Sequence, residues 1–143
     1  MDLRRRKPQA PGDTEALKIV LDTHIVVHAA NDDLEPARKR LLEDAASELF
    51  VSAVTLWELT KLVELGHLVM PNGFERFIRD LCAHPRYTIA QYDAALMIEL
   101  LQVAKKMHKD PADQIIVATA RRLDAALMTD DRQIRRSKLT EIV

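Results

Sequence analysis

The order of apolar and polar residues predicts strands that alternate with helices. Short runs rich in branched apolar residues, typical of buried parallel strands, fall at residues 18–22, 48–52 and 125–129. Between them, apolar residues recur every three or four positions, which predicts helices. The predicted helices cover residues 23–28, 34–46, 53–66, 72–84, 91–107, 111–123 and 131–136. This alternation predicts an α/β domain whose parallel sheet carries helices on both faces.

Two shorter segments are candidates for further strands. They are "YTIA" at residues 87–90 and "LTEIV" at residues 139–143, so the central sheet is expected to hold four or five strands. Residues 1–16 have a different character, with two prolines, a basic run of four residues and few apolar side chains. They are predicted to form a flexible basic tail before a single domain at residues 17–143. The basic run is either solvated or in contact with RNA phosphates.

The composition excludes few classes of protein. The chain has 143 residues, 48% apolar and 30% charged, which fits one soluble domain with a sizeable core. Its formal net charge of -1 neither favours nor excludes a nucleic-acid partner. The single cysteine, Cys82, cannot form an internal disulfide and is expected to pack in the core. No apolar run approaches the roughly 18 residues of a membrane span, so a cytoplasmic protein without membrane contact is expected.

Acidic residues follow two of the predicted strands directly. Asp22 ends the first, and the pair Asp130–Asp131 follows the strand at residues 125–129. In a parallel sheet, ligands bind beyond the carboxyl ends of the strands. These acids are therefore expected at the edge where function is usually located.

Two more acids fall on the apolar faces of predicted helices. Glu58 shares a helix face with Val54 and Leu62, where an unpaired carboxylate is costly to desolvate. The alternative is a carboxylate at the helix edge that pairs with Lys61 or with water. Asp113 lies in the first turn after Asp110 and Pro111, which predict a helix start.

The position of Asp113 is open to two interpretations. An acid near a helix N-terminus is favourable by a few tenths to about 1 kcal/mol without any further role. Asp113 also aligns with the apolar residues Ile116 and Val117, so it tops the buried face of its helix. That helix end is expected near the carboxyl ends of the strands, and hence near Asp22.

These acids together predict a metal centre. Asp22, Glu58, Asp113 and one of Asp130 or Asp131 could converge, and close carboxylates repel unless cations join them. Hard divalent ions with oxygen ligands, Mg²⁺ or Mn²⁺, fit best, whereas no His/Cys cluster has zinc spacing. Such a site can activate water for phosphodiester hydrolysis. The pattern therefore predicts metal-dependent phosphoryl transfer.

Four segments resemble one known family in order and spacing. They are "VLDTHIVVHA", "VSAVTLWELTKLVELGHL", "HKDPADQIIVATARRL" and "ALMTDDRQI". They resemble PIN domains, above all the VapC-type toxins of toxin–antitoxin pairs, and the resemblance spans residues 18–143. It implies a three-layer α/β/α fold with a mainly parallel sheet and Mg²⁺- or Mn²⁺-dependent cleavage of RNA. It also implies a homodimer and an antitoxin whose peptide covers the acidic pocket.

The resemblance also implies a role for each acid. Asp22, Glu58 and Asp113 match the family's acids, and these three would hold the metal with a fourth. Family sequences often have a Thr, a variable residue and then an Asp, which selects Asp131 as the fourth acid. Asp130 then takes the variable position. One departure is Leu62, where many relatives have a lysine, so no role is carried over for Lys61.

Other polar residues are expected in secondary roles. The hydroxyls of Ser52 and Thr129 are expected to lie beside the metal ligands or the substrate, and the Asp130 carboxylate is a candidate for the same role. Basic residues that flank two acidic segments are candidates for phosphate contacts, chiefly Arg121 and Arg132, with Arg122, Arg135 and Arg136 beside them. His24 and His108 are expected to be satisfied by partners without acting as acid–base groups, and Trp57 is expected in the core.

Three other functions remain open at this stage. A strand-ending Asp also begins haloacid-dehalogenase-type phosphatases, but these need an Asp two residues on, where this chain has His24. A PIN-like module could bind RNA or a partner without cutting, although the four acids argue against it. An RNA-processing nuclease of the same fold is the third alternative.

Overall fold

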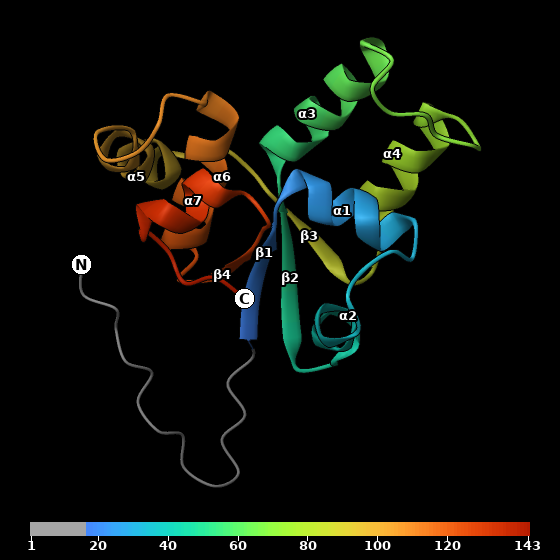
Figure 1. Cartoon of the computed structure of the whole chain (residues 1–143), viewed down its shortest axis with the longest axis horizontal. Coiled ribbons are helices and arrows are strands. Elements are labelled where there is room, and N and C mark those ends of the chain that lie inside the picture. The colour runs from blue at the N-terminus through green and yellow to red at the C-terminus, as the bar shows by residue number, and fades with distance from the viewer. Residues whose placement is uncertain (1–16) are drawn as a thin grey trace, which may run out of the picture.

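The computed structural model describes residues 17–143, and the predicted tail at residues 1–16 lies outside the described part. Figure 1 shows a sheet between two groups of helices. The elements are β1 (Leu17–Leu21), α1 (Thr23–Ala30), α2 (Pro36–Glu43), β2 (Ser47–Ser52), α3 (Ala53–Glu64), α4 (Phe74–Ala83), β3 (Tyr87–Ala90), α5 (Ala94–Ala104), α6 (Pro111–Arg122), β4 (Ala126–Met128) and α7 (Arg132–Ser137).

The sheet has four strands in the order β3-β2-β1-β4, and every neighbouring pair is parallel. This confirms the predicted α/β fold and its parallel sheet. "YTIA" forms β3, as proposed, but "LTEIV" contributes only an isolated bridge between Leu127 and Ile142. The sheet therefore has the lower of the two predicted strand numbers among the residues described.

The core forms one layer on each face of the sheet because strand side chains alternate in direction. Ile19 and Leu21 of β1 pack on one face with buried residues of α1, α3 and α4. Val20 points to the other face and packs with α5, α6 and α7. In Figure 1 these two sets of helices lie on opposite sides of the sheet. Three layers result, as the resemblance implied.

Helix ends follow their capping residues more closely than the apolar pattern. The helix predicted at residues 34–46 begins at Pro36 and ends at Glu43, and the one predicted at 91–107 begins at Ala94. Asp93 accepts a hydrogen bond from the backbone N of Leu96 and so fixes the start of α5. None of the helices within residues 17–143 is long and apolar enough to cross a membrane.

Two side chains expected in the core are at the surface, so those predictions are wrong. Cys82 on α4 is exposed, and Trp57 on α3 is 57% exposed. The buried side chain next to Cys82 is Leu81, and α3 buries Val54 and Leu59. Each surface residue is therefore turned away from the packed face of its own helix. Apolar character alone did not fix which side of the helix it occupies.

The strand order places one end of β1 and β4 at a topological switch point. The chain moves outward from β1 through β2 to β3, then returns to form β4 on the other side of β1. The backbone N of Asp22 donates to the Met128 carbonyl at 3.0 Å, which ties together the carboxyl ends of the two strands. In open α/β sheets, ligands bind in the crevice at such a point.

Candidate metal centre

Asp22 lies at the switch point and is almost completely buried, with 5% of its surface exposed. Oδ1 accepts a hydrogen bond from the backbone N of Thr23 at 2.7 Å, so Asp22 begins α1 as its cap. Oδ2 accepts from Thr129 Oγ1 at 2.5 Å. Burial raises the pKa of Asp22 because it disfavours the charged form, and these hydrogen bonds offset only part of that rise.

Glu58 reaches the same edge of the sheet from α3. Its Oε1 accepts from Thr23 Oγ1 at 2.6 Å, and that hydroxyl also contacts Thr55 Oγ1 at 3.0 Å. Burial is the main cause that raises the pKa of Glu58, and the charges of Asp22 and Asp113 raise it further. Glu58 therefore faces the acidic group, as its place on the apolar stripe predicted.

The alternative partner of Glu58 is not seen. Lys61 Nζ instead forms an ion pair with Glu64 Oε2 at 2.8 Å, one turn along α3. No ion pair within residues 17–143 joins Glu58 to a lysine or arginine. Among the described residues, its carboxylate therefore has no lysine or arginine partner, and its setting disfavours the charged form.

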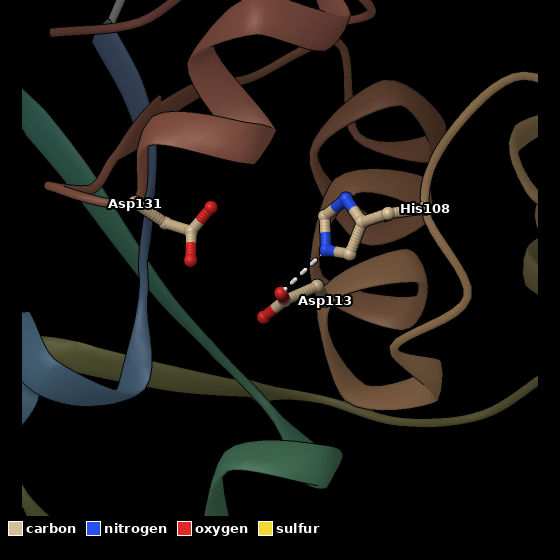
Figure 2. A group of neighbouring side chains, drawn as sticks. All are labelled: His108, Asp113 and Asp131. Atoms are coloured by element: carbon tan, nitrogen blue, oxygen red, sulfur yellow. Dashed lines mark hydrogen bonds and ion pairs between the residues drawn. The ribbon is translucent and has the colours of Figure 1, made fainter.

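Asp113 lies in the first turn of α6, next to the imidazole of His108. Asp110 caps the helix by accepting from the backbone N of Asp113 at 3.1 Å, and Pro111 follows the cap. His108 Nε2 lies 2.8 Å from Asp113 Oδ2 (Figure 2). Burial is the main cause that raises the pKa of Asp113, the His108 contact lowers it, and the charges of neighbouring acids, including Asp131, raise it.

Asp131 completes the group from the segment after β4. His108, Asp113 and Asp131 each offer a ligand atom, and these atoms lie within 4.8 Å of one another. Figure 2 shows both carboxylates directed toward the space between α6 and the loop that leaves β4. Asp131 Oδ1 also accepts from the backbone N of Ile134 at 2.8 Å, so it caps α7 while it faces the group.

The adjacent acids Asp130 and Asp131 differ in where their side chains lie. Asp130 turns away, and its Oδ1 pairs with Arg38 Nη1 at 2.7 Å. Thr129 connects the acids on either side of the switch point, because its buried hydroxyl donates to Asp22 and accepts from the backbone N of Asp131 at 3.0 Å. The predicted place of Thr129 beside the acids therefore has a definite hydrogen-bonding basis.

Two other predicted site residues, Ser52 and Arg121, form hydrogen bonds outside the acidic group. Ser52 is fully buried, and its Oγ accepts from the backbone N of Val54 at 3.3 Å, which begins the helix that carries Glu58. Arg121 forms an ion pair with Glu99 and donates to the Leu139 carbonyl at 2.7 Å. Two of the guanidinium nitrogens of Arg121, Nε and Nη1, are therefore already engaged within the protein.

Sequence reasoning gave too little weight to two side chains at this site. His108 is satisfied by a partner, as expected, but the partner is Asp113, which places the imidazole inside the acidic group. The usable signal was its position in the loop that leads into the Asp110–Pro111 cap. Arg38 was not singled out at all, because α2 carries several basic residues on a polar helix.

The residues present fit a divalent cation. Four carboxylates from separate segments gather at one edge, and three of them have raised pKa values because they are buried near one another. A cation relieves that repulsion, and oxygen-rich ligand sets suit Mg²⁺ and Mn²⁺. An imidazole at His108 adds one nitrogen donor, which Mn²⁺ accepts more readily than Mg²⁺.

Comparisons with known proteins identify one family model and several similar folds. A family model described as PIN domain matches residues 19–138. Among curated proteins, none matches the chain. Three solved structures have a similar fold. DNA-bound VapBC from Salmonella typhimurium is 22% identical with a TM-score of 0.68, and the match covers 89% of this chain and 97% of that chain. VapBC2 from Rickettsia felis, bound to a promoter DNA fragment, is 16% identical with a TM-score of 0.67, and the match covers 89% of this chain and 98% of that chain. A toxin–antitoxin complex from Klebsiella pneumoniae is 18% identical with a TM-score of 0.62, and the match covers 87% of this chain and 95% of that chain.

Proposed function

Because the chain belongs to the PIN domain family, we propose that it is an endoribonuclease that depends on Mg²⁺ or Mn²⁺. The observation that carries the proposal is the gathering of Asp22, Glu58, Asp113 and Asp131 at the switch point between β1 and β4. Within residues 17–143 no lysine or arginine forms an ion pair with any of these four acids, and acids that raise one another's pKa values are poorly stabilised without a cation. The proposed reaction is hydrolysis of an RNA phosphodiester bond by water.

Each part of the chain has a defined task in this proposal. Asp22, Glu58, Asp113 and Asp131 would hold the cation, with His108 beside Asp113. When bound, the cation would supply Lewis acidity toward the phosphodiester and the attacking water. Hydrogen bonds from Thr129 to Asp22 and from Thr23 to Glu58 fix both carboxylates before substrate arrives. Fixed ligands lower the cost of reorganisation during the reaction.

The wider role proposed is that of the toxin in a toxin–antitoxin pair acting in the cytoplasm. Support comes from the fold shared with VapBC structures and with a toxin–antitoxin complex. The proposed homodimer is supported by an apolar surface on α5 and the segment before it. There Tyr92, Met97, Ile98 and Leu101 are exposed, and such patches often mark protein interfaces.

The direct test is a cleavage assay with purified protein and a broad panel of RNAs. Cleavage is expected with added Mg²⁺ or Mn²⁺ and is expected to stop in EDTA, because the acids would lose their cation. DNA oligonucleotides of the same sequences serve as the comparison substrate. Cleavage that persists unchanged in EDTA, or no cleavage of any RNA with either metal, would contradict the proposed activity.

The toxin role has a separate test in growing cells. Induced expression of the wild-type chain alone is expected to arrest growth, and coexpression with its proposed antitoxin is expected to restore growth. The Asp113→Asn variant, expressed to the same level, is the control and should be harmless. If the wild type is harmless at a level where its cleavage activity is measurable, the chain is a nuclease without this role.

A further inference from the structure

Two guanidinium groups converge on one carbonyl oxygen beside the acidic group. Arg38 of α2 donates from Nη2 to the Thr129 carbonyl at 3.1 Å. Arg135 of α7 donates to the same oxygen from Nη2 at 3.1 Å and from Nε at 3.3 Å. The same threonine connects Asp22 and Asp131 through its hydroxyl. Both arginines therefore contact a residue that is itself hydrogen-bonded to two of the proposed metal ligands.

Around the Thr129 carbonyl, the described residues place two positive guanidinium groups and only one carboxylate, that of Asp130. Two like charges that share a neutral acceptor repel each other. Asp130 pairs with Arg38, and within residues 17–143 no other carboxylate forms an ion pair with either arginine. The Asp130 side chain is 62% exposed, whereas that of Arg38 is 13% exposed. Among the described residues, Arg135 is thus left without a carboxylate, and the carboxylate that pairs with Arg38 is on the solvent side.

We propose that Arg38 and Arg135 bind an RNA phosphodiester next to the one that is cut, with Asp130 as a competing anion. This inference rests on the proposed ribonuclease function. The planar fork of a guanidinium matches two phosphate oxygens, and a phosphate would supply the missing negative charge. Its place beside Thr129 puts that phosphate within reach of the acidic group but outside it. Arg38, Arg135 and Asp130 then form one anion-binding group.

The alternative is a purely structural role, in which the arginines only hold the Thr129 carbonyl and so position Asp131. The two roles differ in what the variants change. Loss of a phosphate contact weakens RNA binding and lowers its salt dependence, and it leaves cation binding intact. Loss of a positioning contact reduces the stabilisation by Mn²⁺ and leaves the salt dependence of RNA binding unchanged.

The test measures binding of fluorescently labelled single-stranded RNA by anisotropy in EDTA over a series of salt concentrations. Arg38→Met and Arg135→Met are each expected to weaken binding several-fold and to reduce the salt slope by about 0.7. Asp130→Asn is expected to tighten binding several-fold, because it frees Arg38 for the phosphate. Arg38→Lys should restore much of the salt slope, since it keeps the charge but lacks the fork.

The control is a matched pair of opposite charges elsewhere. Arg76 and Asp80 form an exposed ion pair on α4, and Arg76→Met and Asp80→Asn should leave the binding curves unchanged. The rise in melting temperature with Mn²⁺ is measured for each variant. An unchanged salt slope in both arginine variants, weaker binding by Asp130→Asn, or no RNA binding by wild type would each overturn the inference. The cleavage assay is read separately, so failure of the proposed function is recognised independently.

Discussion

Asp22→Asn and Asp113→Asn are each expected to reduce RNA cleavage by about 10³-fold or more at a fixed Mg²⁺ concentration. Loss of a group that only supports a metal ligand typically costs about 10–100-fold, so loss of a charged ligand should cost more. Asparagine keeps nearly the same shape. Its one acceptor oxygen can keep the bond from the Thr23 backbone N at position 22 or the contact with His108 at position 113, although the bond that Thr129 donates to the second Asp22 oxygen is lost. The loss should therefore come from the missing charge and not from unfolding.

Initial rates measured with one RNA substrate check this prediction, with Asp80→Asn as the matched control. Asp80 is an exposed carboxylate on α4 that pairs with Arg76, so its replacement should leave the rate within about two-fold of wild type. Circular dichroism should show the same helix content for all the proteins. If either site variant cuts RNA within about ten-fold of wild type, its residue lies outside the metal centre.

Much of this arrangement could be predicted because it depends on short-range patterns. A branched apolar run followed by Asp22 places that acid at the carboxyl end of a parallel strand, and the same holds for the residues after β4. The helical period placed Glu58 on the apolar face of α3, and the Asp110–Pro111 cap placed Asp113 in the first turn of α6. Each inference needs only a few neighbouring residues.

The contacts that could not be predicted depend either on side-chain pairing across long separations or on how an irregular loop folds. Arg38 meets Thr129 and Asp130 across more than ninety positions, and nothing in the polar helix α2 distinguishes it from its basic neighbours. The bond from His108 to Asp113 depends on how the loop before α6 folds back, which Gln114 helps to fix by donating to the His108 carbonyl at 2.9 Å. The apolar pattern carries no information about such loops.

Glu58→Gln is expected to stabilise the metal-free protein at pH 7 by roughly 0.5–2 kcal/mol, the usual range for relief of an unfavourable functional residue. The folded state raises the pKa of Glu58, so it binds the proton more tightly than the unfolded chain does. That contribution to stability is complete at low pH and is lost as pH rises through the folded pKa. Glutamine removes this loss, and its Oε1 still accepts from Thr23.

The pKa values of Asp22, Glu58 and Asp113 are all raised in the folded state. The metal-free wild type should therefore become less stable as pH rises from about 4, where carboxylates ionise in the unfolded chain, through these raised folded-state pKa values. Thermal melts in EDTA at several pH values check this. The decrease should be smaller in Glu58→Gln and unchanged in Glu48→Gln, an exposed residue at the opposite end of β2.

Added cation should reverse the order of stability between wild type and Glu58→Gln. A ligand at about 100 times its Kd stabilises the folded state by about 2.7 kcal/mol, which is a rise of roughly 10 °C in Tm for a domain of this size. Wild type and Glu48→Gln should show this rise with Mn²⁺ at pH 7, whereas Glu58→Gln should show less than half of it. If ionisation of Glu58 destabilises the folded protein and a bound cation restores that stability, then the charge of Glu58 contributes to cation binding. If Glu58→Gln destabilises the metal-free protein and keeps the full Mn²⁺ effect, Glu58 instead stabilises the fold through its bond to Thr23, and the centre lies with Asp22, Asp113 and Asp131.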